Sequence, residues 1–529
     1  MGSVLDNLVF SITAVFPTFV LVFLGYLAAR LRVVDRAFTS KLNRICFTYK
    51  PKSARLAEAQ KMGKTAEEEI SDYYTAGRSI SSWIMGLTVA ATIISGGSLI
   101  ATPSLIYAKG LVGAAWQNNG LWYGVLGTAV LGKRFTTLGN RFQVSSIPEL
   151  LGIRFGQTAR KITGFMIVII LFANISTQFS GSARVIESVS GWSYASCIIL
   201  IGVIMTLYIS FGGAKAQSWT NVLQAGFMTF GLVLIAVIAL SKLGLIEMIH
   251  TMGEIDPDLI RMPGVGNYLS IPRFISYGLC LMAVVGIGQP SAQSRFLATK
   301  PGTSFKPAII YGSIAILLWY PCMYVAGAAA KCLLPDLASP DLAFPQLALT
   351  QLHPLLAGIC LAGVLGATMS TATALVLTAS ASITNDIASE KVRRMSPKGI
   401  KVLLIISTLV VSLGGVIMAI DPPELLMTLS TLATGSMGCA FTPMFLGMAY
   451  FPGTTKAGAL SGAIVGGGIV LVGHMNAAWT NPLGFHVIGW GLILGTLVTV
   501  IVSKLTKHSK DEVLEPFYTD GEVIEVAKG

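Results

Sequence analysis

Thirteen runs of apolar residues constrain the fold of this chain more than any other feature, because each run can form a helix long enough to cross a bilayer. Hydrophobic residues make up 53% of the chain and charged residues 12%, whereas soluble proteins carry roughly 25% charged residues. We therefore predict an all-α membrane protein with 13 transmembrane helices. The runs are 9–29, 82–107, 111–132, 162–187, 194–212, 217–241, 271–294, 308–330, 354–384, 400–420, 424–450, 455–475 and 484–503.

The loops between the runs alternate in charge, which predicts the orientation of the chain. Loops 30–64 and 133–161 are rich in Lys and Arg, whereas loops 242–270 and 331–353 carry acidic residues. Basic loops remain on the cytoplasmic side of a membrane. This pattern places the N-terminus outside and the C-terminus in the cytoplasm, with the protein integral to the plasma (inner) membrane. The net charge of +12 then indicates contact with anionic lipid headgroups, not nucleic acid.

Two of the predicted helices contain interruptions, and that of the second run lies at its midpoint. The second run contains Ser95-Gly96-Gly97-Ser98 and the seventh contains Gly286-Ile287-Gly288-Gln289-Pro290. Glycine weakens a helix and proline removes a backbone donor. Matching interruptions in two inverted halves mark the midplane binding site of a transporter. The alternative is an ordinary kink, since Gly and Pro are common in membrane helices.

Hydroxyl side chains lie within the apolar run 354–384. Ala367, Ser370 and Thr371 are three or four residues apart and share one face of a helix. Neutral oxygen donors at membrane depth suit a small hard cation such as Na⁺. Alternatively, these hydroxyls bond only the carbonyls of their own helix or a neighbouring helix.

Polar side chains near the interruptions are candidates for binding a small solute, because such groups usually face the interior of a helix bundle. We expect no acidic residue in this pocket and two half-helix N-termini beside it, so an anionic carboxylate is favoured. A sugar or another neutral solute remains an alternative. The candidate substrate-binding residues are Thr92, Ser95, Gly96, Gly97, Ser98, Gln178, Gln289 and Ser291.

Several ordered motifs resemble the sodium:solute symporter family over about residues 70–505. They are Asp72–Ser79, Ser95-Gly96-Gly97, Phe211–Gln224, Gly288–Arg295 and Ala367–Thr371. The segments Pro335–Leu342 and Leu483–His486 are most similar to the pantothenate:sodium branch of that family.

The resemblance implies a LeuT-type five-plus-five inverted repeat and sodium-driven uptake by alternating access. Na⁺ would be the coupling ion. Its implied ligands are the backbone carbonyls of Ala91, Ile94 and Ala367 and the hydroxyls of Ser370 and Thr371.

Three positions depart from the family pattern. Asn221 stands where some members carry an Asp for a second sodium, so we expect one ion per solute. Ile93 stands where the proline transporters carry Asp, which argues against proline. Ser291 stands where the pantothenate branch carries His, which argues against pantothenate itself if that His contacts the solute.

The expected organisation has four parts. Residues 1–70 form a leading transmembrane helix and a basic cytoplasmic loop, and residues 71–453 form the inverted-repeat core. Residues 454–504 form two further transmembrane helices, and residues 505–529 form a polar, mobile cytoplasmic tail.

Other classes of function are less well supported by the sequence. A non-transporting sensory membrane module is the main alternative, although the segment 505–529 is too short for a signalling kinase domain. An enzyme is not expected, because the five His residues are scattered and form no catalytic set. The seven Cys residues form no CxxC pair and are given no metal or redox role. The sequence indicates no particular oligomeric state.

Overall fold

The computed structural model describes residues 95–117, 126–211, 214–299, 302, 304–388, 395, 397–421, 426–476 and 479–518. Within these ranges the regular structure is helical, which confirms the all-α prediction. The leading helix expected at 9–29, the rest of segment 1–70 and the first half of the run 82–107 lie outside the described residues.

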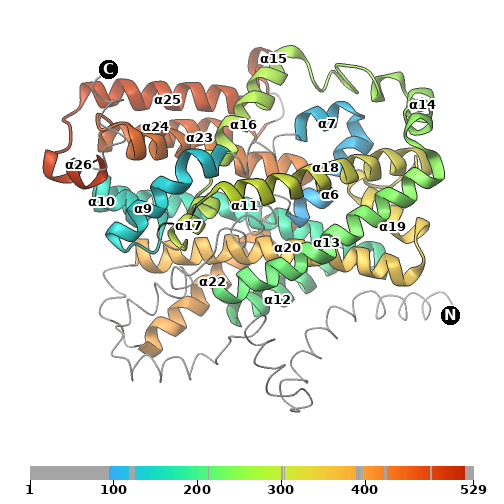
Figure 1. Ribbon diagram of the computed structural model, residues 1–529, viewed down its shortest axis with the longest axis horizontal. Helices are drawn as coiled ribbons and strands as arrows, with labels where there is room; N and C mark the ends of the chain where they lie inside the picture. Colours follow the sequence, from blue (N-terminus) through green and yellow to red (C-terminus); the bar gives the residue numbers. More distant parts are fainter. Residues whose placement is uncertain are drawn as a thin grey trace.

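Several long helices run along the long axis of the molecule, and two of them, α11 (Gln157–Ser190) and α20 (Pro354–Ala381), lie within the bundle (Figure 1). These two helices pack against each other and are buried along most of their length. Both also contact α6 (Gly96–Lys109) and α22 (Pro397–Ala419), and α11 packs on α23 (Leu426–Tyr450) as well. The candidate residues of α6, α11 and α20 therefore lie on helices that touch one another.

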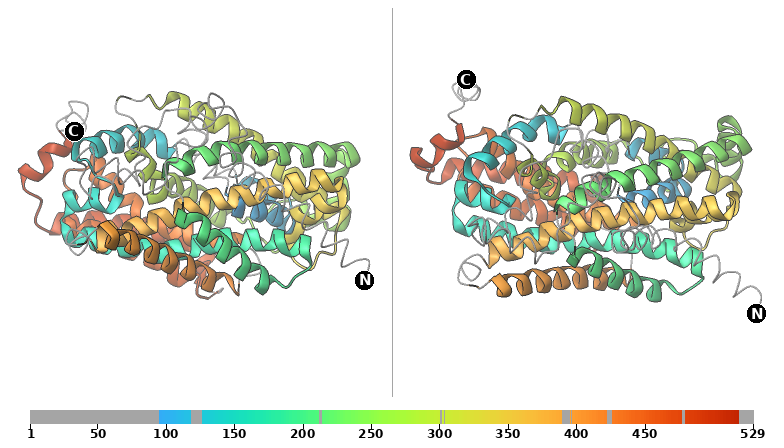
Figure 2. Two further views of the ribbon diagram at one scale, coloured as in Figure 1. Left: turned by 90° about the horizontal axis from the view of Figure 1, so that it is seen from below. Right: turned by 60° about the horizontal axis from the view of Figure 1, so that its bottom comes forward.

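The outer helices expose apolar faces suited to lipid. α12 (Tyr194–Phe211) packs beside α22 at one edge of the bundle (Figure 2), while α13 (Ala214–Leu243) and α18 (Lys306–Leu333) cover another side of α20 and α6. Eight of the described helices are long and apolar enough to cross a membrane. The count of thirteen spans stays a prediction.

One end of the bundle is formed by α9 (Lys133–Phe142), α10 (Ile147–Phe155) and α26 (Asp511–Tyr518), at the left of Figure 1. We call it the basic end. Residues 511–518 of the predicted tail form a helix, and Phe517 and Tyr518 are buried. The Phe517 ring packs on Phe142 with centroids 4.9 Å apart, and Arg134 donates a hydrogen bond to the Phe517 carbonyl. Because residues 505–529 are polar on average, burial of Phe517 and Tyr518 was not expected from the sequence.

Arginines predicted only as loop charges serve as donors at the basic end. Arg154 is buried and donates to Ser509 Oγ at 2.8 Å and to the carbonyls of Pro452 and Thr454 at 2.9 and 3.0 Å. These bonds join α10 to the loop after α23 and to the segment before α26. The helices α24 (Lys456–Gly473) and α25 (Val487–Leu505) pack together and against α23.

The opposite end carries α14 (Leu245–Ile255), the short helix η5 (Pro340–Leu342) and α19 (Ala343–Gln351). Asp341 is 1% exposed, and its carboxylate accepts hydrogen bonds from Ser104 Oγ at 2.6 Å and from the Leu426 amide at 3.2 Å. Burial raises the pKa of the Asp341 carboxyl to about 6, while Ser104, the Arg184 charge and Leu426 oppose that shift. Asp341 thus links the C-terminal part of α6 to the first residue of α23.

Short elements connect these helices. They are α7 (Val112–Gln117), η2 (Thr128–Gly132), η3 (Pro257–Leu259), α15 (Ile271–Arg273), η4 (Phe274–Leu279), α16 (Cys280–Ile287), α17 (Pro290–Leu297), η6 (Ser382–Ile387) and η8 (Pro482–Gly484).

Candidate functional site

The predicted interruption of the seventh run is present in the structure. α16 ends at Ile287, Gly288 and Gln289 are not helical, and α17 begins at Pro290. Gln289 has φ −99° and ψ 102°, which is extended backbone. We call residues 286–290 the second junction.

The second junction is packed closely on both sides. A Cβ on Gly127 would lie 2.0 Å from the Gly286 carbonyl oxygen, and one on Gly288 would lie 2.6 Å from the Gly438 carbonyl oxygen. Gln289 is 1% exposed, and its Nε2 donates to the Thr434 carbonyl of α23 at 2.9 Å. Ser291 is also buried, in the first turn of α17. Two of the predicted solute residues therefore lie together at this junction.

Within the second run, α6 begins at Gly96, where the interruption was predicted. Ser95 is extended (φ −71°, ψ 160°) and its hydroxyl accepts a hydrogen bond from the Ser98 amide at 3.1 Å. The Gly97 amide donates to Gln178 Oε1 of α11, also at 3.1 Å. We call residues 95–98 the first junction. The structure brings Ser95, Gly97, Ser98 and Gln178 together, whereas Thr92 lies outside the described residues.

These bonds qualify the expectation that a half-helix N-terminus is free to bind an anion. Two of the first amides of α6 already have acceptors, one from Ser95 and one from Gln178. At α17 the first residue is Pro290, which has no amide hydrogen, and the Ala292 amide bonds the Gln289 carbonyl at 3.0 Å. An anionic solute must therefore compete with the Gln178 side chain at the first junction.

The proposed sodium ligands on α20 are buried and close to one another in the chain. Ser370 Oγ donates to the Ala367 carbonyl at 3.0 Å. Thr371 Oγ1 is buried and has no hydrogen-bond partner in the described part of the chain, and an unsatisfied hydroxyl of this kind costs about 1–3 kcal/mol. A monovalent cation would satisfy the oxygen, since hard cations prefer oxygen ligands. Ala91 and Ile94 lie outside the described residues, so the full ligand set stays a prediction.

In the described part of the chain no three His, Cys, Asp or Glu residues gather as metal ligands would. The oxygens present at the two junctions and on α20 are neutral hydroxyls, amides and carbonyls. Such a set suits a weakly held, releasable monovalent ion better than a divalent one.

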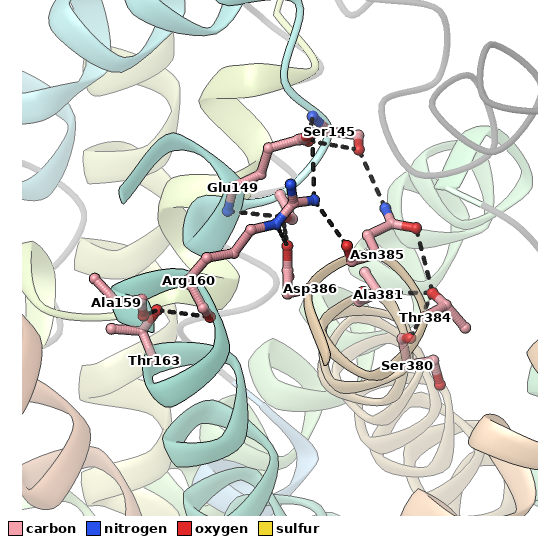
Figure 3. A network of polar contacts seen from close by, with 11 residues as sticks. Ser145, Glu149, Ala159, Arg160, Thr163, Ser380, Ala381, Thr384, Asn385 and Asp386 are labelled. Carbon is pink, nitrogen blue, oxygen red and sulfur yellow. Dashed lines mark hydrogen bonds and ion pairs between the residues drawn. The ribbon is translucent and has the colours of Figure 1, made fainter. Parts of the chain in front are cut away.

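A charged network holds α20 at the basic end, and sequence reasoning did not identify it. Figure 3 shows Arg160 of α11 between Glu149 of α10 and Asp386 of η6. Arg160 Nε donates to Asp386 Oδ1 at 2.9 Å, and its Nη2 donates to the Asn385 carbonyl at 2.7 Å. Ser146 Oγ donates to the same Asp386 oxygen at 2.8 Å. The sequence signal for this network was a charged residue at the margin of each of two apolar runs, Arg160 before 162–187 and Asp386 after 354–384.

Buried hydroxyls add a second link between α11 and α20. Ser182 Oγ donates to Thr368 Oγ1 at 2.6 Å, and Thr368 Oγ1 donates to the Leu365 carbonyl at 2.7 Å. The helix with the candidate sodium ligands is thus joined to the helix that carries Gln178. Gln293 of α17 was also missed, although it lies only three residues beyond the helix-breaking Pro290.

Comparison with known proteins identifies what this arrangement resembles. The model of the sodium:solute symporter family matches residues 73–466. The sodium/pantothenate symporter of Escherichia coli is 30% identical over 440 residues, covering 82% of this chain and 90% of that protein. The sodium/proline symporter of Staphylococcus aureus is 27% identical over 476 residues, covering 84% of this chain and 89% of that protein.

Solved structures agree on the fold. A Na⁺-coupled sialic acid symporter in a substrate-bound, outward-open state superposes with a TM-score of 0.66 at 19% identity, covering 83% of this chain and 93% of that one. The nucleobase-cation-symport-1 family transporter Mhp1 superposes with a TM-score of 0.50 at 14% identity, covering 84% of this chain and 97% of that one.

Proposed function

Because this chain belongs to the sodium:solute symporter family, a family of multi-pass membrane transporters and not of enzymes, we propose that it imports a small organic carboxylate such as pantothenate. Na⁺ is the coupling ion. The 30% identity to a pantothenate symporter supports the choice of solute. Ser291, where the pantothenate branch has His, argues against pantothenate itself if that His contacts the solute. A sugar or another neutral solute is the alternative.

The proposed sodium site combines the carbonyls of Ala91, Ile94 and Ala367 with the hydroxyls of Ser370 and Thr371. The observation that carries this assignment is the buried Thr371 hydroxyl, which has no hydrogen-bond partner among the residues that the structure describes. Asn221 in place of a carboxylate supports one sodium per solute. A Hill slope near one for uptake against Na⁺ concentration is expected, and a slope near two would contradict the single site.

The proposed solute site lies between the two junctions. Thr92, Ser95, Gly96, Gly97, Ser98 and Gln178 form one side, and Gln289 and Ser291 form the other. An ionised carboxylate is a stronger acceptor than a neutral amide oxygen. We therefore expect a solute carboxylate to displace Gln178 Oε1 from the Gly97 amide, which would release the Gln178 side chain to bind the rest of the solute.

The proposed architecture has 13 transmembrane helices, with a five-plus-five inverted repeat in the second to the eleventh. The basic end faces the cytoplasm of a plasma-membrane protein, since basic loops remain inside. The N-terminus is then outside. The two junctions are then accessible to ion and solute from one side of the membrane and from the other in alternation.

The test is uptake into proteoliposomes. Labelled pantothenate, proline and a neutral sugar are each supplied with and without an inward Na⁺ gradient. We expect pantothenate to accumulate only with the gradient. If the sugar alone accumulated, the proposed substrate would be a neutral solute and not a carboxylate. If a wide panel of carboxylates, sugars and amides all failed to accumulate, a sensory membrane module would be favoured.

A further inference from the structure

The second junction contains a backbone carbonyl that has lost its helical donor. In a continuous helix the Gly286 carbonyl would accept from the amide of residue 290, four positions later. Residue 290 is proline, which has no amide hydrogen. A buried carbonyl without a partner is unfavourable, so the bend needs a donor from elsewhere.

Gln293 supplies that donor. Its side-chain Nε2 donates to the Gly286 carbonyl at 2.8 Å and to the Ile287 carbonyl at 3.1 Å. Both amide hydrogens are therefore used on the last two carbonyls of α16. The orientation of the amide is fixed by chemistry, because the reverse placement would set Oε1 against two carbonyl oxygens.

The oxygen of the Gln293 side-chain amide shows how strongly the two donated bonds are favoured. Gln293 is 0% exposed, and its Oε1 is buried with no hydrogen-bond partner among the described residues. An apolar side chain of similar length would avoid burying that oxygen. The polar residue is stable there only because its two donated bonds offset the unsatisfied oxygen.

The packing around the bend leaves little room for a substitute donor. Gly127 lies so close to the Gly286 carbonyl that a Cβ there would be 2.0 Å from it, and Gly288 lies directly on Gly438. We propose that Gln293 is a positioning residue which locks the bend between α16 and α17 by replacing the donor that Pro290 lacks.

The consequence for transport rests on the proposed function. The bend sets the extended conformation of Gln289, whose side chain reaches the Thr434 carbonyl of α23. With the bend locked, the second junction moves as one unit with α23 and presents Gln289 and Ser291 to the solute in a fixed geometry. Loss of the lock should raise the KM for solute more than it lowers the maximal rate.

The first measurement does not depend on the solute. Hydrogen exchange of segment 286–297 is followed in the purified full-length protein in Na⁺ buffer, for the wild type and for Gln293→Met, which keeps the side-chain length but has no donor. We expect exchange in this segment to be about tenfold faster in the variant. Gln157→Met, at an exposed position in the first turn of α11, is the matched control and should leave the segment unchanged.

The double variant Pro290→Ala/Gln293→Met tests the chemistry of the lock. Residue 290 then has an amide hydrogen that can bond the Gly286 carbonyl, so Gln293→Met should have a smaller effect in this background than alone. Gln293→Glu keeps the shape but replaces the donors by acceptors, and it should loosen the segment at least as much as Gln293→Met. Equal exchange in Gln293→Met and the wild type, or equal effects in both backgrounds, would overturn the proposal.

The second measurement is the KM and maximal rate of Na⁺-driven uptake of labelled pantothenate. Gln293→Met should raise the KM about tenfold, and the double variant should recover part of that loss. An unchanged KM in a loosened segment would remove the link to transport. If the wild type transports no pantothenate while exchange behaves as expected, the proposed solute fails and the lock stands.

Discussion

Polar groups are used differently at the ends of the bundle and at its middle. At the ends they are titratable groups: Arg160 pairs with Asp386 at the basic end, and the Asp341 carboxyl joins two helices at the opposite end. At the junctions they are neutral, with Gln178 and Gln293 bonding the ends of half-helices. Charges are far less costly near a membrane surface than at its centre. Under the proposed function, the ends fix the scaffold, while the polar groups of the middle exchange partners with ion and solute.

The largest expected effect is on stability at the basic end. Arg160→Met leaves Asp386 buried without its cation, which should lower the free energy of unfolding by about 3–5 kcal/mol. Thermal denaturation of the purified protein measures this change, with Lys161→Met at the exposed neighbouring position as the control. A melting temperature equal to that of the wild type would show that the network does not fix the scaffold.

The next effect is a pH dependence at the opposite end. Asp341 has a folded pKa of about 6 against an ordinary value of about 3.9. Between those values the folded protein binds more protons than the unfolded chain. The contribution of Asp341 to stability is therefore complete below pH 4 and is lost as the pH rises through 6, by at most about 3 kcal/mol.

Asp341→Asn should flatten that slope, measured as the free energy of unfolding from pH 4 to pH 7. Asp336→Asn, at an exposed position in the same loop, should leave the slope as it is in the wild type. If the two variants had the same slope, Asp341 would not be the group responsible.

At the first junction the expected effect is on transport and not on folding. A Cβ on Gly97 would lie 2.8 Å from Thr177 Cγ2 and 3.1 Å from Gln178 Nε2. Gly97→Val should therefore push Gln178 away and reduce Na⁺-driven uptake about a hundredfold or more, roughly 2.7 kcal/mol. Gly468→Val, at a glycine with open space around it, is the control. Near-normal uptake by Gly97→Val would place the solute elsewhere.

The smallest of these effects concerns the ion. Thr371→Val keeps the shape of the side chain and removes the unpartnered oxygen, so the Na⁺ concentration for half-maximal uptake should rise about tenfold, or roughly 1.4 kcal/mol. Thr378→Val is the control, because that hydroxyl bonds the Ala374 carbonyl of its own helix. A larger change in the control than in Thr371→Val would contradict the assignment of Thr371 as a ligand.

The sequence predicted the interruptions well because Gly and Pro act on the local backbone. The break at Gly288 and Gln289 and the start of α6 at Gly96 were both expected from the positions of Gly and Pro in the two runs. The partners of these breaks were harder to predict, because Gln178 lies 81 residues from Gly97 and belongs to another helix. Gln178 was expected to bind solute, and in the structure it first serves as a hydrogen-bond acceptor for the backbone.

Longer-range pairing was missed for the same reason. Arg160 and Asp386 are 226 residues apart, and one sequence gives no measure of which charges meet across such a distance. Phe517 and Tyr518 were overlooked because the tail was judged by its average polarity, whereas two apolar residues suffice to anchor a short helix. Helix breaks caused by local residues could be predicted from the sequence, whereas contacts between distant segments could not.

The docked tail also has a consequence for the order of biosynthesis. Arg134 donates to the carbonyl of Phe517, 383 residues later in the chain, and Arg154 donates to Ser509, 355 residues later. At about 5–20 residues per second, roughly 20 to 80 s separate the synthesis of Arg134 from that of its acceptor. During that interval the early half of the protein carries guanidinium groups whose final acceptors have not yet left the ribosome. The basic end is thus the last part of the molecule that can be completed, and a chain stalled before residue 509 would expose an unfinished surface to cellular quality control.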